Sequence, residues 1–278
     1  MTIRDILVHL DDGASCAGRL DAAIQLAQTH QAHLTGLYIM PHSSIPGYID
    51  VQIPADILQT LEDRLIATAQ TVEEKFKQAT DLAGLAAEWR CQKGFAADLV
   101  LDHGHYADLI VVGQRDPDSI GGPALEEIPD HIILSAGRPV LVIPKNYAGG
   151  TIGKRVIVGW DRGQRATRAI HDAIPLLQKA DQVSVLIVNR DDSQDDGSKL
   201  PAVDIAHHLA RHDVHVEADH ITSTDMGVGD QLLARAADMG ADLLVSGAYG
   251  HARWRELILG GVTRQLLDQM PIPLLMSH

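Results

Sequence analysis

Short apolar runs alternate with amphipathic segments along the whole chain. The apolar runs predict buried strands, and segments with apolar positions three and four residues apart predict helices. Continuous apolar strands separated by helices are typical of a parallel sheet that is covered on both faces. The predicted strands cover residues 4–10, 33–39, 86–91, 108–113, 140–143, 155–160, 183–188, 214–221, 242–246 and 273–276. One predicted helix begins near residue 15. The other predicted helices cover residues 55–80, 96–104, 130–136, 164–179, 200–211, 229–239 and 262–269.

The same motifs occur twice, in the same order. The matched segments are 4–11 with 155–161, 108–113 with 242–247, and 138–143 with 272–276. We interpret the chain as a tandem duplication whose copies join at a short Gly-rich linker near 145–153. We therefore expect two tandem doubly wound domains of the α/β class, at residues 1–147 and 153–278, each with an open, Rossmann-like parallel sheet and right-handed crossovers.

The second copy carries a glycine motif between its fourth strand and the helix at 262–269. Gly247, Gly250, Gly260 and Gly261 follow the spacing Gly-x2-Gly-x9-Gly-Gly. Glycine lets the backbone approach a ligand closely, and free N–H groups at a helix N-terminus attract anions. Ligands of open α/β sheets bind beyond the carboxyl ends of the strands. The motif predicts a phosphate-binding loop, and the alternative is a plain loop with a glycine hinge.

The motif resembles the Gly-x2-Gly-x9-Gly-(Ser/Thr) motif of nucleotide-binding universal stress proteins, and the segment Glu256–Gly260 resembles that family too. Gly261 departs from the pattern, because the family usually has Ser or Thr there and its hydroxyl is lost. The resemblance covers essentially the whole chain. It implies a fold like that of the adenine nucleotide alpha hydrolases, with ATP as ligand. By this resemblance, the nucleotide is bound by residues of the glycine loop and of the helix start that follows it, which are Gly247, Gly250, Gly260, Gly261, Val262 and Thr263.

Two further positions belong to the adenosine end of the expected site. Asp161 ends the first strand of the second copy, on the same sheet edge as the glycine motif. A carboxylate there accepts hydrogen bonds from a ribose or an adenine edge, and the resemblance implies the same place for it. The alternative is an N-cap for the helix that begins near Gly163. By the resemblance, the backbone of Val188 faces adenine.

The first copy keeps one glycine of the motif, Gly113, but not the others. The repeat alignment places Asp116, Glu126 and Glu127 opposite glycines of the second copy. Carboxylates in that position repel a phosphate. We therefore expect the nucleotide site of the first copy to be degenerate, with Asp11 capping a helix instead of contacting a ligand.

The composition limits which kinds of binding partner and which cellular compartment we expect for this protein. The formal net charge of -14 argues against sequence-independent binding to nucleic acid or to an anionic membrane. No run of 18 apolar residues occurs, so no membrane span is expected. The chain has two cysteines, Cys16 and Cys91, which fits the reducing cytoplasm.

Motifs of the common hydrolases are missing from the sequence. Neither a Gly-x-Ser-x-Gly elbow nor a His-Glu-x-x-His helix occurs, so no catalytic residue is predicted. His208 and His212 have the i,i+4 spacing that can bind zinc, but surface histidines explain them more simply, and no metal site is predicted. Mg²⁺ that bridges nucleotide phosphates is the better candidate ion. The cations nearest to the glycine motif in sequence are Arg253 and Arg255.

These observations favour an ATP-binding regulatory protein of the stress response, with an unidentified protein partner. The alternatives are an interaction protein that binds no nucleotide and a slow ATPase. Each copy ends in an apolar strand, Val140–Ile143 or Leu274–Met276, whose open edge needs cover. We expect these strands to pair, which makes the chain an intramolecular pseudo-dimer. A homodimer through other surfaces stays open.

Overall fold

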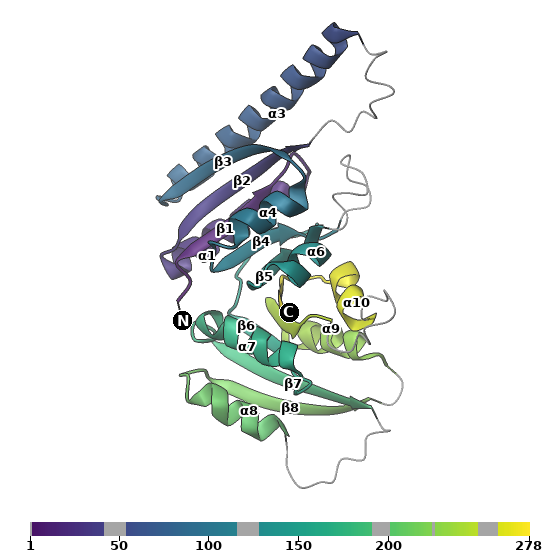
Figure 1. Cartoon of the computed structure of the whole chain (residues 1–278). Helices are drawn as coiled ribbons and strands as arrows, with labels where there is room; N and C mark the ends of the chain where they lie inside the picture. The colour runs from purple at the N-terminus through teal and green to yellow at the C-terminus, as the bar shows by residue number, and fades with distance from the viewer. Residues whose placement is uncertain (1, 42–53, 116–127, 191–200, 224–225, 250–260) are drawn as a thin grey trace.

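The computed structural model describes residues 2–41, 54–115, 128–190, 201–223, 226–249 and 261–278. Its strands form a single sheet in the order β3-β2-β1-β4-β5-β10-β9-β6-β7-β8 (Figure 1). The strands are β1 (Asp5–Leu10), β2 (His33–Pro41), β3 (Ala87–Gly94), β4 (Leu109–Gly113), β5 (Val140–Ile143), β6 (Arg155–Gly159), β7 (Gln182–Arg190), β8 (Val216–Ser223), β9 (Leu243–Gly247) and β10 (Leu274–Ser277). The helices are α1 (Cys16–His30), α3 (Ala55–Leu82), α4 (Ala96–Gly104), α6 (Ile128–Ser135), α7 (Gln164–Leu177), α8 (Pro201–Ala210), α9 (Val228–Met239) and α10 (Gly261–Gln269).

Each copy contributes one half of the sheet. Within a copy all pairings between neighbouring strands are parallel. The first copy has the order β3-β2-β1-β4-β5, and the second repeats it as β8-β7-β6-β9-β10. The predicted fold class, two tandem doubly wound parallel-sheet domains, is therefore confirmed.

The two halves meet where β5 and β10 pair antiparallel. Val142 lies opposite Leu274, and Val140 lies opposite Met276. These four side chains are fully buried. The expected pairing of the last strands is confirmed, and each strand covers the open edge of the other. The result is one continuous sheet that runs through both copies.

Helices cover both faces of this sheet, because the strands are apolar on both sides. One core lies beneath α1, α3, α7 and α8 and includes Leu26, Phe76 and Leu177. The other lies beneath α4, α6, α9 and α10 and includes Ile132, Leu232 and Leu266. Among the helices that the structure describes, none is both long and apolar enough to cross a membrane.

Some element boundaries differ from the prediction. Helix α6 covers Ile128–Ser135 in the described residues and so includes Ile128 and Pro129, which the predicted helix did not. The prediction stopped at Pro129, but proline is tolerated in the first turn of a helix, where its missing N–H is not needed. Strand β8 covers Val216–Ser223 and so lies two residues later than expected.

Candidate functional site

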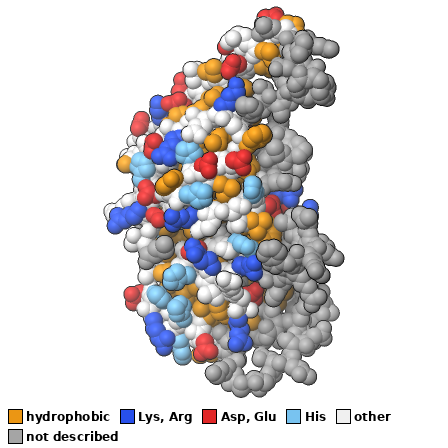
Figure 2. Space-filling model, viewed as in Figure 1, with side chains coloured by type: hydrophobic (Ala, Val, Ile, Leu, Met, Phe, Trp, Pro, Cys, Tyr) orange, Lys and Arg blue, Asp and Glu red, His pale blue; other side chains and the backbone are white. Residues whose placement is uncertain are grey.

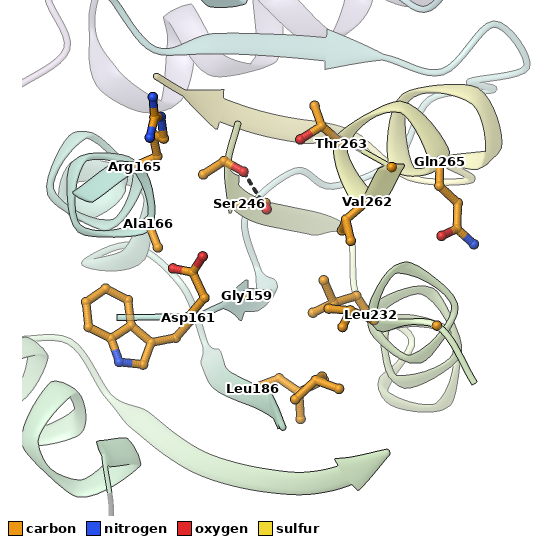
Figure 3. A pocket seen from close by; sticks show the side chains of 16 residues that line it. Gly159, Asp161, Arg165, Ala166, Leu186, Leu232, Ser246, Val262, Thr263 and Gln265 are labelled. Carbon is orange, nitrogen blue, oxygen red and sulfur yellow. Dashed lines mark hydrogen bonds between the residues drawn. The ribbon is translucent and has the colours of Figure 1, made fainter. Parts of the chain in front are cut away.

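A pocket of about 610 Å³ opens at the carboxyl ends of β6, β7 and β9 (Figure 3). β6 lies between β7 and β9 in the sheet, and the helices that follow β6 and β9 start from this edge. Such an edge is the usual place for a ligand in an open α/β sheet. The volume is in the range of small-molecule and cofactor sites.

The predicted site residues converge on this pocket. Asp161 and Val188 line it together with Gly247 and the run 261–263. Gly250 and Gly260 lie outside the described residues. Residues far apart in the sequence, from three different strand ends, therefore share one concave surface.

Three helices begin at the rim of the pocket. The lining includes Ala166 in the first turn of α7, Val228 at the start of α9 and Gly261 at the start of α10. The first N–H groups of a helix have no partner within the helix, and the helix dipole makes this end partly positive. Arg165 adds a full positive charge to the lining. Together these groups favour a negatively charged ligand.

An apolar wall completes the pocket. Leu186, Leu232 and Val262 gather on one side, with Asp161 and Ala166 opposite them (Figure 3). Leu186 and Leu232 are buried, so their contribution to the wall is fixed by the core behind them. A ligand that suits this pocket has an apolar part and an anionic part.

The two glycines in the described part of the motif differ in their surroundings. A Cβ atom at Gly247 would lie 2.5 Å from the backbone nitrogen of Ala166, so a side chain there would collide with α7. A Cβ atom at Gly261 would meet nothing within 4 Å. Gly247 is therefore required for packing, whereas the space for a Ser or Thr at position 261 is present.

Asp161 organises the turn in front of α7. Its Oδ1 accepts a hydrogen bond of 2.7 Å from the N–H of Gly163, which is itself the N-cap residue of the helix. Asp11 and Gly13 make the equivalent bond in the first copy, at 2.9 Å. The alternative in which Asp161 is the N-cap is therefore wrong in detail. Like Asp11, it fixes the turn that precedes the helix, and it also lines the pocket of the second copy.

Tyr249, just beyond β9, connects three parts of the molecule. Its N–H donates a hydrogen bond of 3.0 Å to Oγ1 of Thr263 in α10. Its hydroxyl donates a bond of 2.6 Å to Oδ1 of Asp130, in helix α6 of the first copy. Burial raises the pKa of the Tyr249 hydroxyl, and the hydrogen bond to Asp130 raises it further. The chain beyond β9 is thus fixed both to α10 and to the other copy.

Sequence reasoning missed ten of the sixteen residues that line the pocket, Gly159 and Arg165 among them. Gly159 lines it at the end of β6, and Arg165 lines it from the first turn of α7. The expectation had been that Arg253 and Arg255 are the nearest cations, and both lie outside the described residues. A signal for Gly159 was present in the repeat alignment, where this position is His9 in the first copy.

In the first copy, large side chains lie at the corresponding places. His9 is matched with Gly159 and is only 4% exposed. Arg19 is matched with Ala169 and is 3% exposed. A Cβ atom at Gly113 would overlap the guanidinium of Arg19, so Arg19 fills the space beside this strand end.

The buried charge of Arg19 is balanced by Asp11, whose Oδ2 lies 2.5 Å from its Nη2. Burial, the largest effect, favours the neutral form of Asp11, but Arg19 and His9 together hold the pKa of its carboxyl below the usual value. Burial, assisted by the charge of Arg19, lowers the pKa of His9 to about 4. The N-cap residue of α1 is Ser15, so the predicted capping role of Asp11 is wrong; Asp11 holds the turn before the helix and pairs with Arg19.

Metal ligands do not cluster in the described part of the chain, where no group of three or more His, Cys, Asp or Glu side chains could hold an ion. The rings of His208 and His212 lie 4.8 Å apart, centroid to centroid, in an edge-to-face arrangement. Cys16 and Cys91 are both free thiols.

Comparison with known proteins identifies the family. The model of the universal stress protein family matches residues 2–144 and again 153–278. Universal stress protein Slr1230 of Synechocystis is 27% identical over 185 residues, which are 66% of this chain and 62% of that protein. Universal stress protein YxiE of Bacillus subtilis is 26% identical over 145 residues, which are 50% of this chain and 97% of that protein.

A solved structure extends the similarity to the whole fold. A universal stress protein from Archaeoglobus fulgidus superposes with a TM-score of 0.74 at 16% sequence identity, covering 98% of this chain and 97% of that one. The family model matches both copies, and this structure has the same arrangement throughout. The chain therefore belongs to the universal stress protein family and contains two tandem copies of its domain.

Proposed function

We propose that this protein binds one ATP molecule, in the pocket of the second copy, and acts as a nucleotide-responsive regulator in the stress response. The observation that carries the proposal is the pocket's division into two parts. Three helix N-termini and Arg165 favour the phosphates, and the apolar wall favours the adenine. The free thiols Cys16 and Cys91 support a place in the reducing cytoplasm.

The proposal gives each lining residue a role. Leu186 and Val188 contact the adenine, and Asp161 accepts a hydrogen bond from a ribose hydroxyl. The backbone around Gly247 and Gly261 receives the phosphates, together with Gly250 and Gly260 as the motif implies. Mg²⁺ would be held chiefly by phosphate oxygens and water, as is usual for this ion.

We further propose that the first copy holds no nucleotide. The support is the buried pair of Arg19 and Asp11 together with His9, which fill the region equivalent to the pocket. The degenerate motif of the first copy, with Asp116, Glu126 and Glu127, lies outside the described residues and supports the same conclusion by charge alone. One nucleotide per chain follows.

A universal stress protein in complex with cAMP is 21% identical over 51% of this chain. Its TM-score of 0.39 is too low to place a ligand here, so the proposal rests on the pocket itself.

The proposal is tested by giving the second copy the side chain that fills the first. Gly159→His places an imidazole in the pocket, where a Cβ atom would make only ordinary contacts, the nearest at 3.4 Å to Leu232. We expect ATP affinity in calorimetry to fall by at least about tenfold. Val203→His, at an exposed position of α8 outside the pocket, serves as the control and should bind like the wild type. Equal ATP affinities in both folded variants would show that ATP does not bind in this pocket.

One observation favours a second function, that of an interaction protein that binds no nucleotide. Gly261 has no hydroxyl, so the protein lacks a phosphate contact that the family motif usually supplies. A protein that acts only through a protein partner would show no heat with ATP at any concentration tested. A slow ATPase would bind ATP and release phosphate above the rate of the Gly159→His variant, which separates it from a regulator that only binds.

A further inference from the structure

A second concave surface lies between α7 and α8, on the outer side of the helices that cover the second copy. Its volume is about 670 Å³. Ile170 of α7 and Ile205 of α8 contribute to its lining and are almost fully buried, which gives the groove an apolar floor. Trp160, at the end of β6, adds an aromatic ring to the wall. The groove therefore offers an apolar surface large enough for a small organic group.

The rim of this groove is basic although the chain as a whole carries a formal charge of -14. Arg165, Arg168 and His171 of α7 face His208 of α8 across it. None of the described lining residues is an aspartate or glutamate. Figure 2 shows histidines gathered over the region where α7 and α8 lie in Figure 1, with Lys and Arg side chains beside them.

The groups of this rim differ in how far neighbouring groups balance their charges. Nε of Arg168 donates a bond of 2.7 Å to the buried Asp172, and its Nη2 donates one of 3.3 Å to the carbonyl of Gly137. Asp172 offsets the charge of Arg168, so Arg165, whose Nε also donates a hydrogen bond of 3.4 Å to Nδ1 of His278, contributes the main positive charge of the rim. Desolvation lowers the pKa of His208, and the nearby His212, His171 and Arg211 lower it further. The imidazole of His208 is therefore uncharged at neutral pH, and Arg165 supplies the attraction for an anion.

The groove is separate from the nucleotide pocket. Trp160 and Arg165 line both and form the wall between them, while the other lining residues differ. In the described part of the chain, the buried Nε1 of Trp160 has no hydrogen-bond partner. A buried donor without a partner is unusual in a folded protein.

We propose that the groove between α7 and α8 binds a small organic phosphate, with its apolar group on Ile170 and Ile205 and its phosphate among Arg165, His171 and His208. Arginine makes charge-assisted hydrogen bonds to phosphate, and an imidazole N–H can donate to a phosphate oxygen. The apolar floor selects a phosphate ester over inorganic phosphate. The second copy thus has two ligand sites that share one wall.

The test uses phenyl phosphate as the probe, in calorimetry on the full chain with the Gly159→His change. That background fills the nucleotide pocket, so failure here does not bear on ATP binding. His171→Gln with His208→Gln should weaken binding of the probe about tenfold. Both histidines are exposed, so the change is compatible with folding. The matched control is His207→Gln with His215→Gln, two exposed histidines outside the groove, and it should bind as the background does.

Three results would overturn the proposal. The first is no binding of phenyl phosphate at millimolar concentration. The second is equal affinity in the groove variant and in the control variant, which places the probe elsewhere. The third is a failure of selectivity, in which inorganic phosphate or uncharged benzyl alcohol binds as tightly as phenyl phosphate.

Discussion

The hydrogen bond between Tyr249 and Asp130 joins the predicted nucleotide site to the other copy, and Tyr249→Phe removes it. The two side chains are 4% and 7% exposed, and the bond measures 2.6 Å. The other carboxyl oxygen of Asp130, Oδ2, is buried and has no hydrogen-bond partner among the residues that the structure describes. The variant keeps the aromatic ring and its packing, so the loss is confined to one hydroxyl.

The expected cost follows from the environment of the bond. A buried hydrogen bond to a charged group contributes about 1.5–3 kcal/mol, more than one between neutral groups, and removal leaves the acceptor unsatisfied. We therefore expect the free energy of unfolding to fall by about 2 kcal/mol. Asp130→Ala breaks the same bond from the other side. The double variant should then show a coupling energy of about 2 kcal/mol between the two positions.

The assay is urea unfolding of the full chain, followed by circular dichroism. Tyr106→Phe is the matched control, because Tyr106 is 84% exposed, and it should change stability by less than about 0.5 kcal/mol. A Tyr249→Phe variant as stable as this control would refute the reasoning. So would a coupling energy near zero, since the bond would then contribute nothing to the contact between the copies.

Three further predictions follow from the sheet, the buried histidine and the glycine motif. Val142→Pro removes a backbone N–H donor of the β-ladder that faces β10. After protease cleavage of the 145–153 linker, the variant halves should separate in gel filtration, whereas the wild-type halves stay together. Co-elution of the variant halves would contradict the pairing of β5 with β10. His9 is buried and has a pKa of about 4, against 6.5 when exposed. Its contribution to the free energy of unfolding is therefore fully present above pH 6.5 and is lost as pH falls towards 4, by up to about 3 kcal/mol. His9→Asn should flatten the dependence of unfolding free energy on pH in that window, and an unchanged slope would rule out His9 as its source. Gly261→Ser supplies the hydroxyl of the family motif where space exists, so ATP affinity should rise about fivefold, and weaker binding would show that the phosphates lie elsewhere.

Much of the fold could be predicted because its signals are local or repeated. The apolar runs of β4 and β9 and the helical spacing in α1 identify elements without reference to the rest of the chain. The duplication gave every element a counterpart and identified β5 and β10 as the two open edges. The presence of Pro129 within α6 escaped prediction, because a proline near a helix start looks the same in sequence as a proline before a helix.

The candidate site was predictable only in part. Asp161 and Gly247 could be placed because the carboxyl ends of parallel strands share one edge. Arg165 could not, since a cation in the first turn of a helix points towards the pocket or towards solvent depending on the helix orientation. The filling of the first copy by Arg19 also needs coordinates, because it depends on a guanidinium reaching Gly113 from another element.

The number of ATP molecules bound per chain tests the account most directly, because the two copies share a fold and differ in the space at their strand ends. Equilibrium dialysis of the wild-type chain against labelled ATP measures this number. A value near one is predicted, because the pocket lies beside Gly159 in the second copy, whereas the buried side chains of His9 and Arg19 lie at the matched places in the first. A value near two would contradict the filled first copy, and a value of zero would contradict the nucleotide pocket itself.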